Sequence, residues 1–432
     1  MAKGAFKGGI HPHDRKAATA DMPIAWAPVP EQLILPMSQH LGAPCVPTVE
    51  VGQHVVRGEI VGSVEAFISA PVHSPVDGLV KAIGPCLTAG GTRVTAVTIV
   101  PDAEQDLDAY RAVAADDSRG MVKAAGIVGM GGATFPTTVK LSPPADSPVN
   151  TVILNGCECE PFLTCDHRLM VESPERVVDG ARKIAALVGA SRVVICVEDN
   201  KPDAVEVLRS VAGDDVEVRS LPTRYPQGAE KQLIWSILEK EVPHGKLPAA
   251  TGALVHNVAT AVAIADAIDK GKPLTERVVT VTGAVARPGN YRVLLGTLVS
   301  DLLEYAGGTV GEVGRIIAGG PMTGPALASL DVPVAKGTSG IVVLAAEEAA
   351  PAVEDDQPCI RCGRCSEACP MFLQPYAIAN HAARQDWNVA DQYSPLDCIE
   401  CGCCSYVCPT SRPLVQLIRL AKAAAMAKGV KL

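Results

Sequence analysis

Aromatic side chains are scarce in this chain of 432 residues, which contains only 3 Trp, 7 Tyr and 5 Phe. Proteins that bind single-stranded nucleic acid stack bases on aromatic rings, so this composition argues against such a platform. An excess of positive charge is also lacking, because the formal net charge is −9, and this argues against a basic nucleic-acid binder. The hydrophobic content of 48% excludes disorder for most of the chain. A chain of this length can form about three domains.

The sequence also lacks an uninterrupted apolar run of the roughly 18–20 residues that cross a membrane as a helix. The best candidate, residues 251–268, is broken by His256, Asn257 and Asp266. Residues 1–16 contain no apolar core of the kind that a secretory signal peptide needs. These absences predict a protein of the reducing cytoplasm and leave room for a peripheral role at a membrane.

The first two segments differ in character. Residues 1–30 are rich in Gly, Pro and His, and we expect an irregular arm. Residues 31–105 contain short, alternating apolar strands with turns at Gly52 and Gly58. This pattern resembles the barrel-sandwich hybrid of lipoyl and biotinyl carrier domains. The hairpin tip EAFISAPVHS carries no lysine, so a structural or docking role is favoured over that of a covalent carrier.

The rest of the chain predicts a multidomain α/β fold. Residues 115–272 alternate strand-like runs with helix-like runs that have an early Pro and a final Gly, which indicates a Rossmann-like parallel sheet. Residues 276–346 resemble the SLBB module, a β-grasp variant. An acidic linker, 347–358, leads into a cysteine-rich unit at 355–432. Its last helix, 413–432, is basic and apolar, and we expect it to pack internally, with contact to a membrane or partner as the alternative.

Nine of the 15 cysteines lie between Cys359 and Cys408. The runs CIRCGRCSEACP and CIECGCCSYVCP each have the spacing that binds a 4Fe–4S cluster through three thiolates and gives the fourth thiolate to the other cluster. Zinc also binds paired cysteines, but it needs only four ligands per ion, and its sites do not require two C-x3-C-P runs. Cys403 fits no ligand position and is expected to be a buried thiol. The longer segment between the runs looks helical and suggests a helical ferredoxin domain. The predicted ligands are Cys359, Cys362, Cys365 and Cys408 for the first cluster, and Cys398, Cys401, Cys404 and Cys369 for the second.

A glycine-rich loop, AGIVGMGGATFPTTVKL at 125–141, precedes a predicted helix. Gly129, Gly131 and Gly132 let backbone N–H groups approach a phosphate, and a helix N-terminus favours an anion. Lys140 adds a positive charge. The loop is neither a Walker A motif nor a complete dinucleotide fingerprint, so a tight turn is the alternative.

The segment NGCECEP, residues 155–161, lies at the end of a predicted strand at 150–158. It places Asn155, Glu158 and Glu160 where an open α/β sheet binds its ligands. Acidic side chains there accept hydrogen bonds from sugar hydroxyls or a flavin ring, with a solvated strand end as the alternative.

Together the two segments resemble GRGGAGFPTG-K and NADEGEP of the NADH-binding, FMN-containing subunit of respiratory NADH:quinone oxidoreductase. Cys157 replaces the Asp of that pattern and Cys159 a Gly. RYPQGAEKQLI is similar to the family's Y-x-x-GEE segment, and HNVATAVAI to its NNVETLA segment. This resemblance implies FMN as a cofactor and NAD(H) as a substrate. The cofactor-binding residues that it implies are Gly129, Gly131, Gly132, Phe135, Lys140, Asn155, Glu158, Glu160, Tyr225, Gly228, Glu230, Asn257 and Thr260. No acid–base residue is expected, since hydride transfer depends mainly on alignment.

Over essentially the whole chain, six ordered motifs resemble the RnfC family, which belongs to the ion-translocating Rnf electron-transport complexes. They begin with FKGGIHPHDRK and end with the two cluster runs. The resemblance implies a peripheral, NADH-oxidising oxidoreductase subunit on the cytoplasmic side of the cell membrane. It would pass electrons between NAD(H), FMN and two 4Fe–4S clusters, with the other Rnf subunits, both membrane and ferredoxin-like, as partners and ferredoxin as an indirect one. The alternatives are a soluble flavoprotein that feeds another reductase and a relay or docking subunit without NADH activity.

Overall fold

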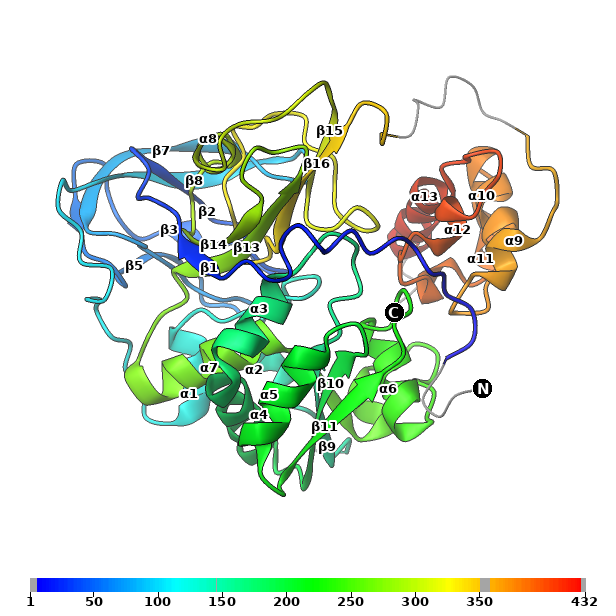
Figure 1. Ribbon diagram of the computed structural model, residues 1–432, viewed down its shortest axis with the longest axis horizontal. Coiled ribbons are helices and arrows are strands. Elements are labelled where there is room, and N and C mark those ends of the chain that lie inside the picture. Colours follow the sequence, from blue (N-terminus) through cyan, green and yellow to red (C-terminus); the bar gives the residue numbers. More distant parts are fainter. Residues whose placement is uncertain (1–5, 145, 350–357, 429–432) are drawn as a thin grey trace.

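The computed structural model describes residues 6–144, 146–349 and 358–428. It confirms the multidomain α/β fold. A barrel-sandwich unit and a β-grasp unit lie above an α/β domain, and a helical cysteine-rich unit lies to one side (Figure 1). Most of the predicted linker, the first five residues and the last four fall outside the described residues. Among the described helices, none is long and apolar enough to cross a membrane.

The barrel-sandwich unit consists of two small sheets, ordered β2-β8-β7-β4 and β3-β5-β6. Alternate strand residues face inward, so that Leu33, Leu35 and Ile99 are completely buried. The hairpin tip that carries a lysine in carrier domains instead presents Phe67, which is 78% exposed. The strands are β2 (Leu33–Pro36), β3 (Val46–Pro47), β4 (His54–Val55), β5 (Ile60–Ser63), β6 (Val72–His73), β7 (Gly78–Leu87) and β8 (Arg93–Pro101).

The α/β domain is built on a parallel sheet of order β11-β10-β9-β12. Helices α4, α5 and α7 share one hydrophobic core with this sheet, and α6 packs in a separate core, so the sheet is covered on both faces. Helix α4 begins at Pro174 and ends before Gly189, which is left-handed, as the sequence predicts. The elements are α1 (Ser118–Ala124), α2 (Thr137–Lys140), β9 (Thr151–Gly156), α3 (Cys165–Glu172), α4 (Pro174–Val188), β10 (Arg192–Glu198), α5 (Pro202–Ala212), β11 (Val216–Leu221), α6 (Glu230–Leu238), the 3-10 helix η1 (Pro248–Thr251), β12 (Ala253–Asn257) and α7 (Val258–Lys270).

The β-grasp unit has a five-stranded sheet of order β1-β14-β13-β16-β15. The N-terminal arm is therefore not irregular throughout, because Ile24–Trp26 form strand β1 and pair in parallel with β14. This pairing covers a strand that would otherwise be an open edge, and three residues are too few to show a strand pattern in the sequence. The elements are β1 (Ile24–Trp26), β13 (Glu276–Gly283), β14 (Gly289–Leu294), α8 (Val299–Tyr305), β15 (Val313–Ala318) and β16 (Gly340–Ala345).

The cysteine-rich unit is helical around its own small core. Ile378 of α10 packs against Leu414 and Ile418 of α13. The basic residues of α13 also have internal partners, since Lys422 lies 2.6 Å from a Glu400 oxygen. The described part of the last helix is thus a packing helix. The elements are α9 (Arg364–Glu367), α10 (Pro375–Ala383), α11 (Trp387–Asp391), η2 (Pro395–Asp397), α12 (Cys403–Tyr406) and α13 (Leu414–Ala427).

Candidate cofactor sites

Two asparagines lie side by side at the carboxyl ends of the central strands. Asn155 of β9 and Asn257 of β12 are register partners. The Asn155 amide donates to the Gly228 carbonyl at 2.8 Å. The Asn257 oxygen caps α7 by accepting from the Ala259 N–H at 2.8 Å, and its amide donates to the Asp166 carboxylate at 2.6 Å. The sheet thus brings three predicted site residues from distant segments to one edge.

The glycine loop is anchored at its base on both sides. The Gly129 N–H donates to the Phe135 carbonyl at 2.9 Å, which closes the loop on itself. The Met130 N–H donates to the Thr260 hydroxyl of α7 at 3.0 Å. Thr260 and Phe135 therefore hold the loop in place, and the ring of Phe135 is half-buried beside it.

The tip of the loop, Gly131 and Gly132, is open. Among the described residues, neither N–H finds a hydrogen-bond acceptor. A Cβ on Gly131 would lie 2.7 Å from the Asn257 amide nitrogen, whereas a Cβ on Gly132 would meet no described atom within 4 Å. The helix that follows, α2, is a single turn. The expected helix-end field is therefore weak, and the N–H groups of the loop itself are the anion donors that the structure provides.

Lys140 and Glu230 meet at this edge of the sheet. The Lys140 ammonium lies 2.7 Å from a Glu230 oxygen and donates to the Val255 carbonyl at 2.6 Å. An ammonium group has three donors, so one remains for a ligand beyond these two described partners. The loop and this charge fit a phosphate-bearing cofactor.

Glu158 and Asp166 form a carboxylate pair beneath the loop. Glu158 has a positive φ of 46°, and its carboxylate accepts from the Asp166 N–H at 2.7 Å. Burial, and then the Glu158 charge, raise the pKa of Asp166 to about 7, while the Arg277 guanidinium opposes this shift. Sequence reasoning missed Asp166; its signal was an acidic residue in the first turn of the next helix.

The side chain of Glu160 points away from these residues. Its carboxylate accepts from the Met322 N–H at 3.0 Å and from the Thr323 hydroxyl. Burial raises its pKa, and these hydrogen bonds oppose the shift. Glu160 thus ties the α/β domain to the β-grasp unit. It lies near Tyr225, whose pKa is raised by burial and then by the Glu160 charge, and its hydrogen bonds do not join it to the residues of the glycine loop.

Lys16 of the arm is a second residue that sequence reasoning missed. Its buried ammonium donates to the carbonyls of Glu158 and Glu160, each at 2.9 Å, and to that of Leu163. Burial lowers its pKa. It fixes the turn that carries Glu158, and no local pattern could reveal this because 142 residues separate the two.

Tyr225 lies where the α/β domain meets the cysteine-rich unit. Its side chain is only 2% exposed, and its hydroxyl donates to the Cys401 carbonyl at 2.7 Å. The ring therefore faces a predicted cluster ligand. Burial raises the pKa of this phenol well above its usual range.

The eight predicted cluster ligands fall into two groups that match the exchanged pattern. A cavity of about 180 Å³ is lined by the first set, with Cys408 beside the three cysteines of the first run. A second, smaller cavity is lined by Cys369 and the three predicted ligands of the second run. Cys403 also borders this second cavity, but it is completely buried against Ile10 and Tyr225, and its thiol donates to the Tyr225 carbonyl at 4.0 Å. Each cavity thus presents the four expected thiols from both runs, which fits a 4Fe–4S cluster.

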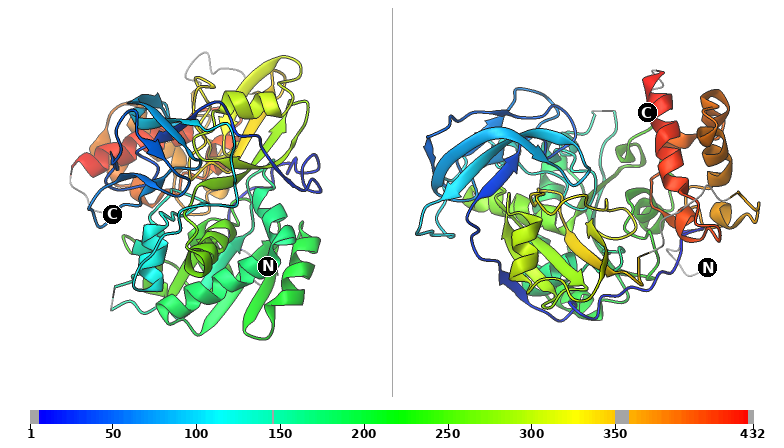
Figure 2. Two further views of the ribbon diagram at one scale, coloured as in Figure 1. Left: turned by 90° about the vertical axis from the view of Figure 1, so that its left-hand side faces the viewer. Right: turned by 90° about the horizontal axis from the view of Figure 1, so that it is seen from above.

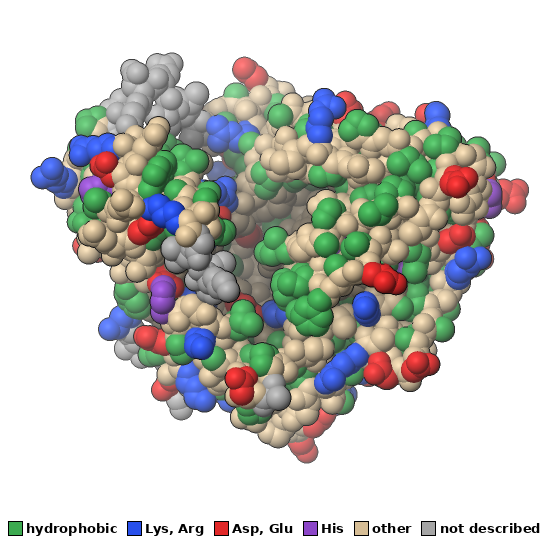
Figure 3. Space-filling view, turned by 180° about the vertical axis from the view of Figure 1, so that it is seen from behind, with side chains coloured by type: hydrophobic (Ala, Val, Ile, Leu, Met, Phe, Trp, Pro, Cys, Tyr) green, Lys and Arg blue, Asp and Glu red, His purple; other side chains and the backbone are tan. Residues whose placement is uncertain are grey.

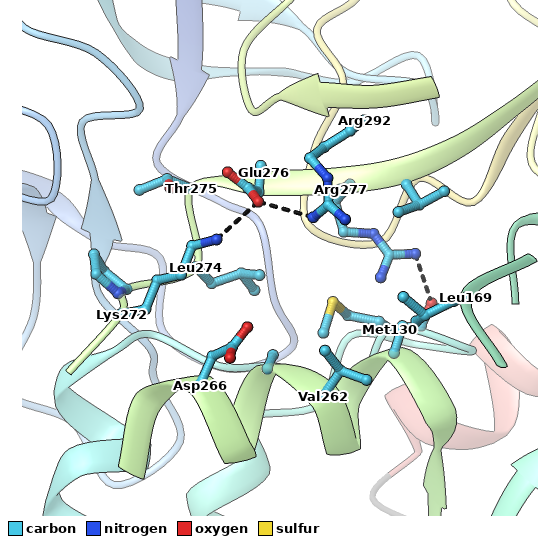
Figure 4. A pocket seen from close by; sticks show the side chains of 14 residues that line it. Met130, Leu169, Val262, Asp266, Lys272, Leu274, Thr275, Glu276, Arg277 and Arg292 are labelled. Carbon is cyan, nitrogen blue, oxygen red and sulfur yellow. Dashed lines mark hydrogen bonds and ion pairs between the residues drawn. The ribbon is translucent and has the colours of Figure 1, made fainter. Parts of the chain in front are cut away.

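Another small cavity, of about 70 Å³, lies between α7 and the strands β13 and β14. Figure 4 shows Glu276 between Lys272 and Arg292, and Arg277 reaching the Met130 carbonyl. This cavity is far smaller than the roughly 300–1,000 Å³ of ligand pockets. It is a seam between units that contains several charged side chains, one of which, Arg277, donates a hydrogen bond to the glycine loop.

Comparisons with known proteins agree with this architecture. Family models match an RnfC barrel sandwich hybrid domain at residues 4–104, a Nuo51 FMN-binding domain at 122–266, an SLBB domain at 278–326 and a 4Fe-4S dicluster domain at 351–409. Fold and sites therefore define an oxidoreductase subunit that combines an FMN-binding domain with a two-cluster iron–sulfur domain.

Two relatives are similar over the whole chain, and each is the component designated C of a larger complex. The chain is 46% identical to that component of the Na⁺-translocating ferredoxin:NAD⁺ oxidoreductase complex of Acetobacterium woodii, over 98% of each chain. It is 43% identical to the proton-translocating counterpart of Clostridium ljungdahlii, over 98% of this chain and 94% of the relative. The chain belongs to the RnfC family, whose members are components of ion-translocating oxidoreductase complexes, and this confirms the resemblance drawn from its motifs.

Among solved structures, an NAD⁺-reducing [NiFe]-hydrogenase in the H2-reduced state is similar in fold. The match has a TM-score of 0.52 at 20% identity and covers 72% of this chain and 67% of that one.

Proposed function

We propose that this chain exchanges electrons with NAD(H) through FMN and passes them singly along two 4Fe–4S clusters, within an ion-translocating complex. One observation carries the proposal. The glycine loop, Asn155, Glu230 and Asn257, which are distant in the sequence, meet at one sheet edge. The second set of cysteines lies against the same domain through Tyr225.

The residues fit the flavin in stated roles. The N–H groups of Gly131 and Gly132 at the open loop tip and the third donor of Lys140 would hold its phosphate. Asn155, Asn257 and Thr260 fix the strand ends and the loop around it. When bound, FMN supplies the conversion between two-electron and one-electron transfer.

On the substrate side of the site, hydride transfer depends on how NAD(H) is aligned with the flavin. The Glu158 and Asp166 carboxylates would accept hydrogen bonds from ribose hydroxyls, and Lys16 holds the turn that carries Glu158 in place. Phe135 offers a ring beside the loop. No side chain is needed to move a proton during hydride transfer, because rate depends on the approach of the two rings.

The electron path follows from which cluster lies closer to the flavin domain. The cluster of Cys398, Cys401, Cys404 and Cys369 would receive electrons first, because Tyr225 bonds directly to the Cys401 carbonyl. The cluster of Cys359, Cys362, Cys365 and Cys408 would follow. Cys362 is exposed, so this second step ends at the surface, where a partner protein is able to take the electron.

The proposed setting is the cytoplasmic face of the cell membrane, with membrane and ferredoxin-like subunits as partners. The names of the relatives support membership of a multi-subunit complex. Co-purification of the tagged chain with membrane subunits tests this setting, and its isolation as a free protein would favour the soluble alternative.

The catalytic proposal is tested on the full chain reconstituted with FMN, iron and sulfide. Addition of NADH is expected to bleach flavin and iron–sulfur absorbance together. The variant Gly132→Val places a side chain in the open tip, where its Cβ meets no described atom within 4 Å, and is expected to lose FMN. Gly84→Val is the matched control, because its Cβ also meets nothing described within 4 Å but lies far from the loop, in β7. Flavin-loaded protein that NADH does not reduce would leave only the relay alternative.

A further inference from the structure

The N-terminal arm crosses every unit of the molecule before it enters the barrel-sandwich unit. Figure 1 shows it starting beside the helical unit and then running between the β-grasp sheet and the α/β domain to strand β1, and Figure 2 shows the same path from two other sides. Figure 3 shows that the opposite face is hollowed between the helical unit and the rest of the chain. The helical unit therefore rests on the body along a limited contact that includes the arm.

Two glycines of the arm lie between the predicted second cluster and Tyr225. Gly8 and Gly9 both have φ of +75°. A Cβ on Gly8 would lie 2.7 Å from the Cys369 carbonyl oxygen, and one on Gly9 would lie 2.6 Å from the Tyr225 carbonyl oxygen. Both the backbone conformation and the space at this point admit only glycine.

The arm is bonded to both sides of this junction. The Gly9 N–H donates to the Ala368 carbonyl at 2.9 Å, one residue before Cys369. Ile10 and Tyr225 exchange two backbone hydrogen bonds, at 2.8 and 3.0 Å. A single short segment therefore bridges the chain next to a predicted cluster ligand and the loop of the α/β domain.

A buried apolar cluster surrounds these hydrogen bonds. Ile10, Tyr225, Ala368 and Cys403 form its core, which draws residues from the arm, the α/β domain and the helical unit. Cys159, Met322, Cys401 and Val407 pack around it. Cys403, which no cluster requires, thus acquires a role as a packing residue of this junction.

The arm is also fixed on its far side. Lys16 is buried under the Glu158 turn, and the Thr19 carbonyl accepts from the Asn290 amide of the β-grasp unit at 2.9 Å. The segment between Gly8 and Thr19 is thus anchored at both ends. The position of the second cluster is tied to the turn that borders the flavin site.

We infer that arm residues 6–10 act as a strap that sets the distance between the flavin and the second cluster, so that they govern electron transfer between them without binding either group. This inference rests on the proposed function. Electron transfer slows steeply with distance, and a displacement on the order of 1 Å at a reacting pair has large kinetic effects. The residues of the strap are positioning residues, because they act through Tyr225 and Cys369.

The test uses Gly8→Ala and Gly9→Ala in the full reconstituted chain. Gly52→Ala is the control, since its φ of +89° imposes the same backbone strain while its Cβ meets nothing described within 4 Å. Flavin and iron content are measured first. Stopped-flow mixing with NADH then follows flavin bleaching and cluster bleaching separately, and EPR titration gives the cluster potentials.

We expect wild-type flavin reduction and unchanged cluster potentials in the strap variants, with cluster reduction at least about tenfold slower. The control should match the wild type. Cluster reduction at the wild-type rate in both strap variants would overturn the strap. Failure of NADH to reduce the flavin in the wild type would instead overturn the proposed function.

If the glycine variants do not fold, Ile10→Ala replaces them, because it keeps the backbone pairing and removes only the apolar contact. The same slowing is expected there, and a wild-type rate contradicts the inference.

Discussion

The ammonium group of Lys140 lies 2.7 Å from the Glu230 carboxylate, across 90 residues of sequence. The pair joins the end of the glycine loop to the first turn of α6. It therefore holds a positive charge at the end of β12, two residues before Asn257, and the flavin phosphate is proposed to bind between this charge and the loop tip.

Lys140→Met is expected to weaken FMN binding. A hydrogen bond to a charged group contributes about 1.5–3 kcal/mol, which corresponds to roughly a tenfold to hundredfold rise in Kd. Quenching of flavin fluorescence on titration of the apoprotein measures this change. Lys123→Met, at an exposed position of α1, is the control and should keep the wild-type Kd. Equal affinity in the two variants would remove Lys140 from the phosphate site.

Cysteine substitutions test the exchanged ligand pattern. Cys408→Ala is expected to remove the first cluster and about half of the bound iron. This is expected although Cys408 lies in the second cysteine run, whose other three ligands bind the second cluster. Cys403→Ala should keep both clusters, because its thiol packs against Ile10 and Tyr225 and stands outside the ligand spacing. Iron analysis and EPR spectra of the dithionite-reduced proteins distinguish these outcomes. Loss of the second cluster's signal in Cys408→Ala would refute the exchange.

The pKa of Asp166 predicts a pH dependence of folding. Burial and Glu158 raise it from the ordinary 3.8 to about 7 in the folded chain. Between these values the folded state keeps a proton that the unfolded state releases, so this residue's contribution to stability falls as pH rises. Asp166→Asn should gain stability relative to the wild type over that range. Thermal unfolding of both apoproteins at several pH values measures the difference, and parallel curves would contradict the prediction.

A buried ion pair between the barrel-sandwich and β-grasp units predicts that substituting its acid destabilises the protein more than substituting its base. Arg57 and Glu276 are 2.5 Å apart, with side chains 2% and 8% exposed. Glu276→Gln leaves the Arg57 charge buried without its partner and should cost about 3–5 kcal/mol. Arg57→Met should cost less, because Glu276 keeps Lys272 at 2.9 Å and Arg292 at 3.0 Å.

Thermal unfolding of the full chain ranks these two variants. The control is Arg182→Met, whose pair with Asp215 is exposed on both sides and is therefore expected to contribute little to stability. If Arg57→Met is less stable than Glu276→Gln, the prediction is wrong.

Spacing along the chain was sufficient for the features that depend on local chemistry. The cysteine runs predict two clusters because ligand spacing reflects the geometry of the cluster itself. Pro174 and Gly189 mark the ends of α4 because their backbone preferences are intrinsic. The order of the four units was also readable, since each has its own strand and helix pattern.

The long-range contacts of individual side chains could not be predicted from the sequence, because they depend on how the units pack. The sequence placed Glu160 and Tyr225 with the flavin, and only the tertiary structure decided that Glu160 bonds to Thr323 and Tyr225 to Cys401. Lys16 carries no local signal for its place beneath the Glu158 turn. The sequence by itself predicted the two clusters, since their ligands are set by residue type and spacing, and it predicted FMN through the resemblance of its motifs to a known family. The tertiary structure decided how they are held relative to one another, because that depends on contacts between residues more than a hundred positions apart.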